Sequence, residues 1–191
     1  MKLRNRIFLN FSSIPNLAKK ARQKSNSYLN EELNKLIKLS SYKGFVGIEF
    51  PYFRFIKNVN SVKNLQHYLI LNNQRYILDC EKRISKKELI KLIFLSKKLK
   101  TKFIRVKCSN ILSCERKNYK NKWISKVNSI IKKINQIKPL LKEYNIKLAI
   151  ENHQDMDSND ILKIIKHVGG NYIGVNFDIG NAFATCELPI E

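Results

Sequence analysis

The sequence predicts a parallel α/β fold, either a closed barrel or a doubly wound sheet, and three observations support this prediction. Short apolar stretches typical of strands alternate with amphipathic stretches typical of helices. Five strand starts fall near residues 45, 75, 102, 146 and 172, which is the spacing of repeated βα units. The 191 residues, of which 43% are hydrophobic, suit a single packed domain over 1–191.

The first half of the chain is expected to hold four strands and three helices. Gly44 ends the first helix, and Pro51 stops the strand that follows it. Ser85, with Glu88 three residues later, forms a capping box that opens the third helix. The predicted strands are 6–11, 45–50, 76–78 and 103–106, and the predicted helices are 28–41, 59–69 and 85–99.

The second half begins with a polar loop over 109–122. Asp157 or Ser158 caps the second helix of this half, and Gly169 and Gly170 end it. After the last strand we expect only a loop, without a covering helix. The predicted helices are 123–141 and 158–168, and the predicted strands are 147–150 and 172–177.

The net charge of +22 suggests a nucleic-acid partner at first sight. The basic residues are 29 Lys and only 8 Arg, and the chain also holds 25 Ile and 22 Asn. Lys, Asn and Ile have A/T-rich codons, so this bias points to mutational pressure. Nucleic-acid readers rely on Arg, whose planar fork grips phosphates and guanine edges. We therefore expect a solvated lysine surface and no nucleic-acid partner.

The cysteine and hydropathy patterns indicate a reduced, membrane-free compartment. The four Cys form no CxxC pair and are too few for a disulfide scaffold. No apolar run approaches the roughly 18 residues of a membrane span, and the basic start lacks the apolar core of a secretory signal. A cytoplasmic protein without membrane contact is predicted.

The positions where the strands end narrow the search for a site. No glycine-rich phosphate motif follows the first strand and no P-loop occurs, which removes the main support for a nucleotide-binding fold. Parallel barrels carry their chemistry at the carboxyl ends of the strands. The chemically useful residues at those ends are Glu49, Asp79, Glu81, Lys107, Glu151, His153 and Asp178.

Glu151 and Asp178 each follow directly after an apolar strand. Neighbouring strand ends lie about 5 Å apart, so these carboxylates are expected to converge above the sheet. Two bare carboxylates at that distance repel each other unless one is protonated or a cation lies between them. Oxygen ligands with some imidazole suit Mn, Mg, Co or Zn, and one divalent metal ion is the predicted cofactor.

Each candidate also has a plainer interpretation. Glu151 would then cap the loop that follows it, and Asp178 would form an Asx-turn before Gly180. A single loop histidine such as His153 is more often a hydrogen-bonding residue than a metal ligand. Glu49 follows a buried strand and serves equally well as a structural or a substrate-facing group.

Two segments, Ile150-Glu151-Asn152-His153 and Phe177-Asp178-Ile179-Gly180-Asn181, resemble the strand-five and strand-six motifs of the xylose isomerase-like TIM barrels. This group contains sugar phosphate isomerases and epimerases and, more distantly, endonuclease IV. Gly47-Ile48-Glu49 is similar to the second strand of the family, and Ile104-Arg105-Val106 to the fourth. The resemblance covers roughly residues 28–190 and is specific in the last 45 residues.

The resemblance implies an eight-stranded barrel with one divalent metal and a small sugar or sugar phosphate as substrate. Glu151 and Asp178 match metal-ligand positions of the family, and Glu151 is also the candidate base in a reaction through a metal-stabilised enediolate. Asn152, His153 and Asn181 would position substrate hydroxyls, and Glu49 would face the substrate.

The departures from the family pattern define the alternatives. We count six of eight βα units, and the two remaining metal ligands would lie beyond Glu191, so the chain resembles a barrel truncated at its C-terminal end. Open sheet edges would favour self-association, and the chain alone is expected to be weakly active or inactive. Asn181 replaces a family histidine, and strands two and three end without His, which disfavours an endonuclease IV-like phosphodiesterase. A non-catalytic barrel fragment is the third alternative.

Overall fold

The computed structural model describes residues 7–14, 26–52, 56, 59–80, 84–112 and 115–188. The chain divides into two compact units, Met1–Asp79 with Ser96–Thr101 and Cys80–Leu95 with Lys102–Glu191. Strands alternate with helices along the chain, and the strand pairs within each unit are parallel. The predicted parallel α/β fold class is confirmed, with six strands in the described residues.

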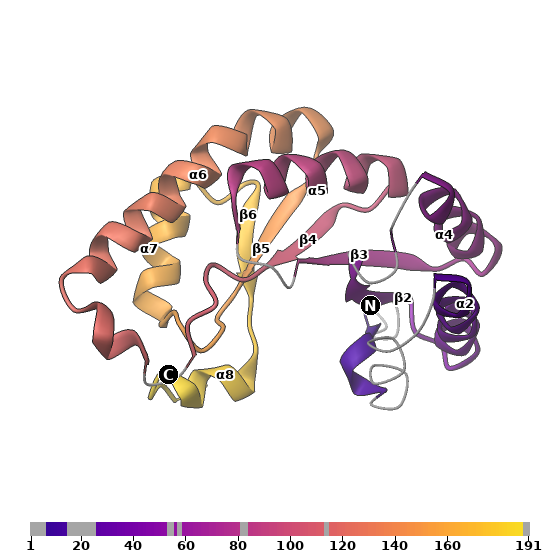
Figure 1. Ribbon diagram of the computed structural model, residues 1–191, viewed down its shortest axis with the longest axis horizontal. Helices are drawn as coiled ribbons and strands as arrows, with labels where there is room; N and C mark the ends of the chain where they lie inside the picture. Colours follow the sequence, from indigo (N-terminus) through magenta and orange to yellow (C-terminus); the bar gives the residue numbers. More distant parts are fainter. Residues whose placement is uncertain are drawn as a thin grey trace. The chain divides into compact units, whose positions relative to one another are not determined.

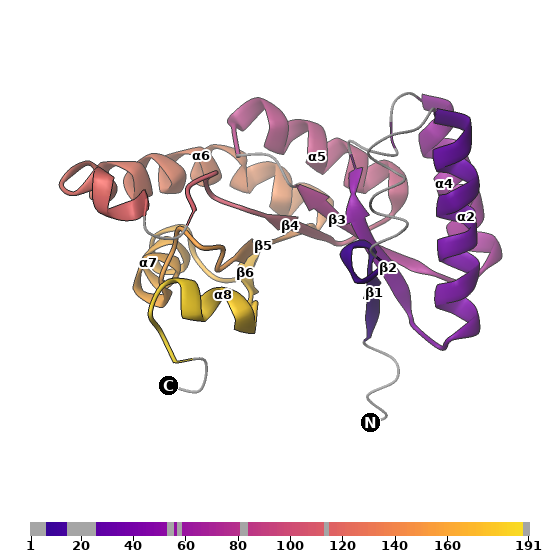
Figure 2. The ribbon, with the colours of Figure 1, turned by 60° about the horizontal axis from the view of Figure 1, so that its bottom comes forward.

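The first unit contains three strands in sequence order, and Leu9, Ile48 and Tyr76 lie in register across them. Its two long helices lie side by side (Figures 1 and 2). The elements are β1 (Phe8–Asn10), η2 (Phe11–Ser13), α2 (Asn26–Tyr42), β2 (Gly47–Pro51), α4 (Val59–Leu71) and β3 (Arg75–Cys80).

Gly47 at the start of β2 permits the close pairing of these strands. A Cβ atom at this position would lie 2.3 Å from the Arg75 carbonyl oxygen and 2.6 Å from the Phe8 ring. No side chain fits there without a shift of the backbone. The buried Ser40 hydroxyl, 3.1 Å from the Gly47 carbonyl oxygen, fastens the end of α2 to the same strand.

The second unit contains β4 (Phe103–Val106), β5 (Lys147–Glu151) and β6 (Ile173–Asn176), again in sequence order. Alternate residues of β4 and β5 are fully buried, among them Ile104 and Ile150. The remaining elements of the chain are α5 (Lys86–Leu99), η3 (Glu115–Tyr119), α6 (Lys122–Tyr144), α7 (Ser158–Val168) and α8 (Ile179–Ala184).

The helices of the second unit follow the apolar stripes of the sequence. The buried residues of α6 recur every three or four positions from Trp123 to Leu141, as a core-facing helix requires. α6 and α7 lie side by side (Figures 1 and 2). Asp157 caps α7 by accepting from the Asp160 backbone N–H at 2.9 Å, and Gly169 ends this helix with φ of 94°.

Helix starts in this part of the chain match the sequence, with one exception at the end. The Glu88 backbone N–H donates to Ser85 Oγ at 3.2 Å, as the predicted capping box requires. The expectation that no helix follows the last strand is wrong, because α8 begins directly after Asp178. The sequence signal was weak because α8 has only six residues and contains a glycine.

Two further expectations concern membrane-spanning helices and the cysteines. Among the described residues, no helix combines the length and the apolar character that crossing a bilayer requires. Cys80, Cys108 and Cys186 are free thiols. Cys108 is buried, and burial raises the pKa of its thiol, so this side chain behaves as a small apolar core group.

Candidate functional site

The candidate site lies where β4, β5 and β6 end. Val106 pairs with Ile150, and Glu151 pairs with Asn176 on the next strand, so the residues that follow share one edge of the sheet. Glu151 is the last residue of β5 and is buried, whereas Asp178 lies two residues beyond β6 and is exposed. The carboxyl ends of the strands therefore carry both residues that the sequence singled out.

Glu151 is held through both of its carboxylate oxygens. Arg105 Nη1 lies 3.0 Å from Oε2, and the Asn181 side-chain amide donates to Oε1 at 3.3 Å. Arg105 pairs in register with Ala149, so the side chains of Arg105 and Glu151, two residues further along β5, point to the same face. Such a countercharge offsets part of the cost of burying a carboxylate. The guanidinium group thus balances the negative charge of Glu151 within the chain.

Asp178 is the N-cap of α8. Its Oδ1 accepts from the Gly180 backbone N–H at 2.9 Å and from the Asn181 backbone N–H at 3.3 Å. This is the Asx-turn that the sequence offered as the plainer interpretation. Asn181 therefore contacts both carboxylates, Asp178 through its backbone and Glu151 through its side chain.

Asn152 braces the same edge through the main chain of Asp178. Its side-chain Oδ1 accepts from the Asp178 backbone N–H at 2.6 Å, and its Nδ2 donates to the Asp178 carbonyl oxygen at 2.9 Å. Asn152 is buried, and both ends of its amide are used by the main chain of Asp178. The structure thus gives this residue a bracing role between β5 and the start of α8.

His153 follows in the loop after β5 and is partly buried. Burial is the main cause that lowers its pKa, followed by the positive charges of Lys107 and Arg105, while Asp178 acts in the opposite direction. Its Nδ1 atom lies 4.0 Å from Oδ1 of the buried Asp155. His153 therefore lies among the charged residues of this edge, and it is neutral near pH 7.

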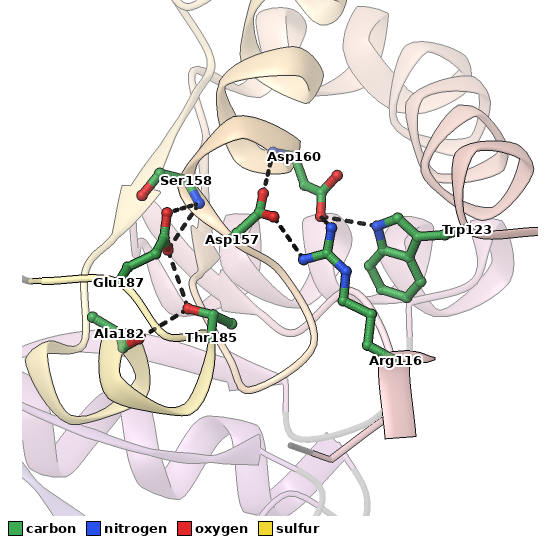
Figure 3. A network of polar contacts seen from close by, with 8 residues as sticks. All are labelled: Arg116, Trp123, Asp157, Ser158, Asp160, Ala182, Thr185 and Glu187. Atoms are coloured by element: carbon green, nitrogen blue, oxygen red, sulfur yellow. Dashed lines mark hydrogen bonds and ion pairs between the residues drawn. The ribbon is translucent and has the colours of Figure 1, made fainter. Parts of the chain in front are cut away.

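The long loop between β4 and α6 is fastened to the start of α7 (Figure 3). Arg116 lies between Asp157, at 2.8 Å, and Asp160, at 3.1 Å, and its guanidinium carbon is 4.7 Å from the centre of the Trp123 ring. The Trp123 indole N–H donates to Asp160 at 2.9 Å. On the other side, the Ser158 backbone N–H donates to the Glu187 carboxylate. The contacts of Arg116 and Trp123 therefore tie η3 and the start of α6 to the first turn of α7.

Glu49 lies in the first unit, on β2, in register with Asn10 and Ile77. Together with Asp79 it raises the pKa of the Tyr76 hydroxyl, an effect second to the burial of that side chain. The Tyr76 hydroxyl donates to the Phe50 carbonyl oxygen at 2.9 Å. The role of Glu49 toward a substrate stays a prediction, and Glu81 lies outside the described residues.

The two carboxylates fit a hard divalent cation as part of its ligand set. Mg²⁺ is commonly held by one or two carboxylates and keeps several waters. Glu151 and Asp178 lie on adjacent strand ends and share contacts with one residue. In the part of the chain that the structure describes, no group of three or more His, Cys, Asp or Glu is arranged to hold a metal. The described residues therefore offer two candidate ligands and no complete protein cage.

Sequence reasoning missed three residues of this region: Arg105, Ser109 and Asp155. Arg105 was visible only as part of a strand, although a charged residue between buried neighbours signals a partner on the adjacent strand. Ser109 and Asp155 are hydrogen-bonded to each other and buried. They lie in separate loops, and no local pattern connects them.

The sequence of this chain matches the model of a known protein family. Residues 78–190 match the model of the xylose isomerase-like TIM barrel, and the chain belongs to this family. No curated protein matches the sequence.

Several solved structures share the fold. A D-psicose 3-epimerase crystallised with D-fructose is 14% identical, with a TM-score of 0.61 over 79% of this chain and 59% of its own. A protein from Anabaena variabilis that is described as a putative sugar phosphate isomerase/epimerase is 16% identical. Its TM-score is 0.66 over 93% of this chain and 64% of its own. A family member from Mycobacterium smegmatis in complex with magnesium is 13% identical, with a TM-score of 0.63 over 95% and 67%. The chain thus spans about three fifths of the first of these proteins.

Proposed function

We propose that this chain carries one part of the active site of a metal-dependent isomerase or epimerase that acts on a small sugar or polyol, or on a sugar phosphate. The observation that carries the proposal is the pair Glu151 and Asp178, which follow β5 and β6 and are linked through Asn181. Membership of the xylose isomerase-like family supports it. Structures described as sugar epimerases share the fold and support the same substrate class.

Glu151 and Asp178 would hold the divalent ion, which can be Mg, Mn, Co or Zn. When bound, such an ion supplies positive charge that stabilises the enediolate form of a sugar. Glu151 accepts the proton from the carbon beside the carbonyl group and returns it to the other carbon or to the opposite face. Arg105, at 3.0 Å, holds the Glu151 carboxylate in place for that transfer.

The polar residues around this pair position the substrate. Asn181 and His153 present hydrogen-bonding groups at the same edge, where substrate hydroxyls would lie. Asn152 acts indirectly, because it fixes the backbone of Asp178. Glu49 is proposed as a further substrate-facing residue from the first unit.

Metal binding by the whole chain tests the proposal without an activity assay. Mn²⁺ titrated into the purified protein and followed by electron paramagnetic resonance should bind at one site. Glu151→Gln and Asp178→Asn should each weaken that binding by about tenfold or more. Glu143→Gln, an exposed carboxylate on α6, is the matched control and should leave it unchanged. Equal Mn²⁺ binding by all four proteins would end the proposal.

The reaction class is tested by deuterium uptake. With a divalent metal present, ketoses and aldoses incubated in D₂O should gain deuterium beside the carbonyl group, detected by proton NMR. Because the chain covers only part of its structural neighbours, slow exchange is expected. Cleavage of abasic DNA in place of exchange would favour the endonuclease IV-like alternative, and metal binding without either reaction would favour the non-catalytic one.

A further inference from the structure

The loop after β5 contains a buried carboxylate, that of Asp155, whose two oxygens lie in different environments. Asp155 has no exposed surface, and its Oδ2 accepts a hydrogen bond from the Ser109 hydroxyl. Ser109 is fixed in turn, because its Oγ accepts from the Ile111 backbone N–H at 3.1 Å. The other oxygen, Oδ1, is buried and has no hydrogen-bond partner among the described residues. Such an oxygen is costly to leave unsatisfied, so its direction is informative.

The imidazole of His153 lies near this oxygen. Nδ1 of His153 is also buried without a hydrogen-bond partner among the described residues, and it lies 4.0 Å from Asp155 Oδ1. A shift of about 1 Å brings the two atoms to hydrogen-bond distance. An ionised carboxylate can only accept, so Nδ1 must then carry the proton of the neutral ring.

The imidazole also lies within electrostatic range of charged residues of the candidate site. The His153 side chain is 16% exposed, and because Nδ1 is buried, the exposed surface belongs to other atoms of this side chain. The charges that act on it belong to Lys107, Arg105 and Asp178, which lie on or beyond the strands that border Glu151. His153 therefore connects the buried Asp155 with the edge that carries Glu151.

We propose that Asp155 is a positioning residue that, anchored by Ser109, holds His153 in the Nδ1–H tautomer and presents the unprotonated Nε2 toward the Glu151 edge. An unprotonated Nε2 is a hydrogen-bond acceptor, suited to a hydroxyl group of a sugar. This last step rests on the proposed function, whereas the tautomer and its cause do not. Ser109, Asp155 and His153 then form a chain of contacts that runs from the core to the site.

A purely structural role for Asp155 makes a different prediction. In that case the Ser109–Asp155 contact only ties the β4–α6 loop to the β5–α7 loop, and His153 is indifferent to it. Loss of either partner would then lower stability, and neither loss would change the imidazole. The protonation pattern of His153 separates the two roles.

The test is a long-range proton–nitrogen NMR spectrum of the ¹⁵N-labelled full chain at a pH where histidines are neutral. The chain has 3 histidines, so His153→Gln assigns the resonances. The wild type should show His153 as the Nδ1–H tautomer. Asp155→Ala should shift it to the Nε2–H form or a mixture, and Ser109→Ala, which keeps the carboxylate, should largely retain Nδ1–H. Asp155→Val, which cannot accept a hydrogen bond, serves if the alanine variant does not fold.

Two results would overturn the proposal: an Nε2–H tautomer in the wild type, or an Nδ1–H tautomer that survives both Asp155 substitutions. Addition of Mn²⁺ then separates this inference from the proposed function. If the function is right, the His153 signals broaden more than those of His67 and His167. A correct tautomer without such broadening would leave the Asp155–His153 pair standing and count against the metal site.

Discussion

Arg105 places a positive charge directly beside Glu151 in the candidate site. It forms an ion pair with Glu151 in which the two side chains are 16% and 5% exposed, so water screens the pair weakly. Loss of one partner removes the countercharge of the other, which is the expensive case for a shielded ion pair. The contact therefore makes a prediction about stability as well as about chemistry.

Arg105→Met should lower the free energy of unfolding by roughly 3 kcal/mol, because the buried Glu151 would lose the countercharge of Arg105. Urea unfolding followed by circular dichroism measures this loss. The double variant Arg105→Met/Glu151→Gln should recover part of it, since no uncompensated charge remains. If the loss in the double variant equals the sum of the losses in Arg105→Met and Glu151→Gln, the two residues are not coupled.

The buried carboxyl group of Asp155 should make the stability of the protein depend on pH. Burial is the main cause that raises the pKa of this carboxyl group to about 6, and the hydrogen bond from Ser109 opposes the shift. The native state therefore binds a proton that the unfolded chain releases at lower pH. This contribution to stability is present below about pH 4 and is lost as the pH rises through about 6, an effect of about 3 kcal/mol.

Other carboxylates titrate in the same range, so a variant must isolate the Asp155 effect. The unfolding free energy of Asp155→Asn, relative to the wild type, should rise between about pH 4 and pH 7. Chemical unfolding at several pH values provides the comparison, and Asp157→Asn, partly exposed and salt-bridged, is the control. A difference that stays flat with pH would mean that Asp155 is not protonated in the native state at these values.

At the scale of elements, α7 depends on contacts made at its first turn. Asp157 has two functions, because its Oδ1 caps the helix and its Oδ2 lies 2.8 Å from Arg116 (Figure 3). Ser158 is the matched neighbour, exposed and joined to Glu187 through its backbone N–H. Substitution at the two positions therefore separates the cap from the general effect of a change in this turn.

Asp157→Ala should destabilise the chain by about 1–2 kcal/mol through loss of the cap. Ser158→Ala should change stability by less than about 0.5 kcal/mol, as surface substitutions usually do. Hydrogen exchange should also speed up in the η3 loop of Asp157→Ala, because Arg116 loses one of its two carboxylate partners. Protection of that loop equal to the wild type would mean that Asp160 and Trp123 hold Arg116 alone.

The elements also show how far a single sequence determines this fold. Strands and long helices were predictable because their apolar residues repeat with fixed periods, as from Trp123 to Leu141 in α6. Glu151 and Asp178 were predictable because each follows directly after such a strand. Arg105 and Asp155 were not, because their partners come from other parts of the chain. Ser109 and Asp155 are 46 residues apart, and only the folded structure brings them together.

At the scale of the molecule, the surface of the second unit carries exposed apolar side chains on β6 and α8. Val175 is 46% exposed on β6, and Ile179 and Phe183 are each 63% exposed on α8. Within the described residues β6 is the last strand in the sheet order, so its outer edge is a template for pairing. Exposed apolar side chains near an open sheet edge favour association.

We expect a second copy of this chain to cover that surface, as the sequence predicted from open sheet edges. Sedimentation velocity should then show a concentration-dependent shift from monomer to dimer. Val175→Lys should move the equilibrium toward monomer, because burial of a lysine charge opposes strand pairing. Leu162→Lys, at a site 48% exposed on α7, is the matched control and should leave the equilibrium unchanged. A wild-type protein that stays monomeric at every concentration, or a control that dissociates equally, would place any association elsewhere.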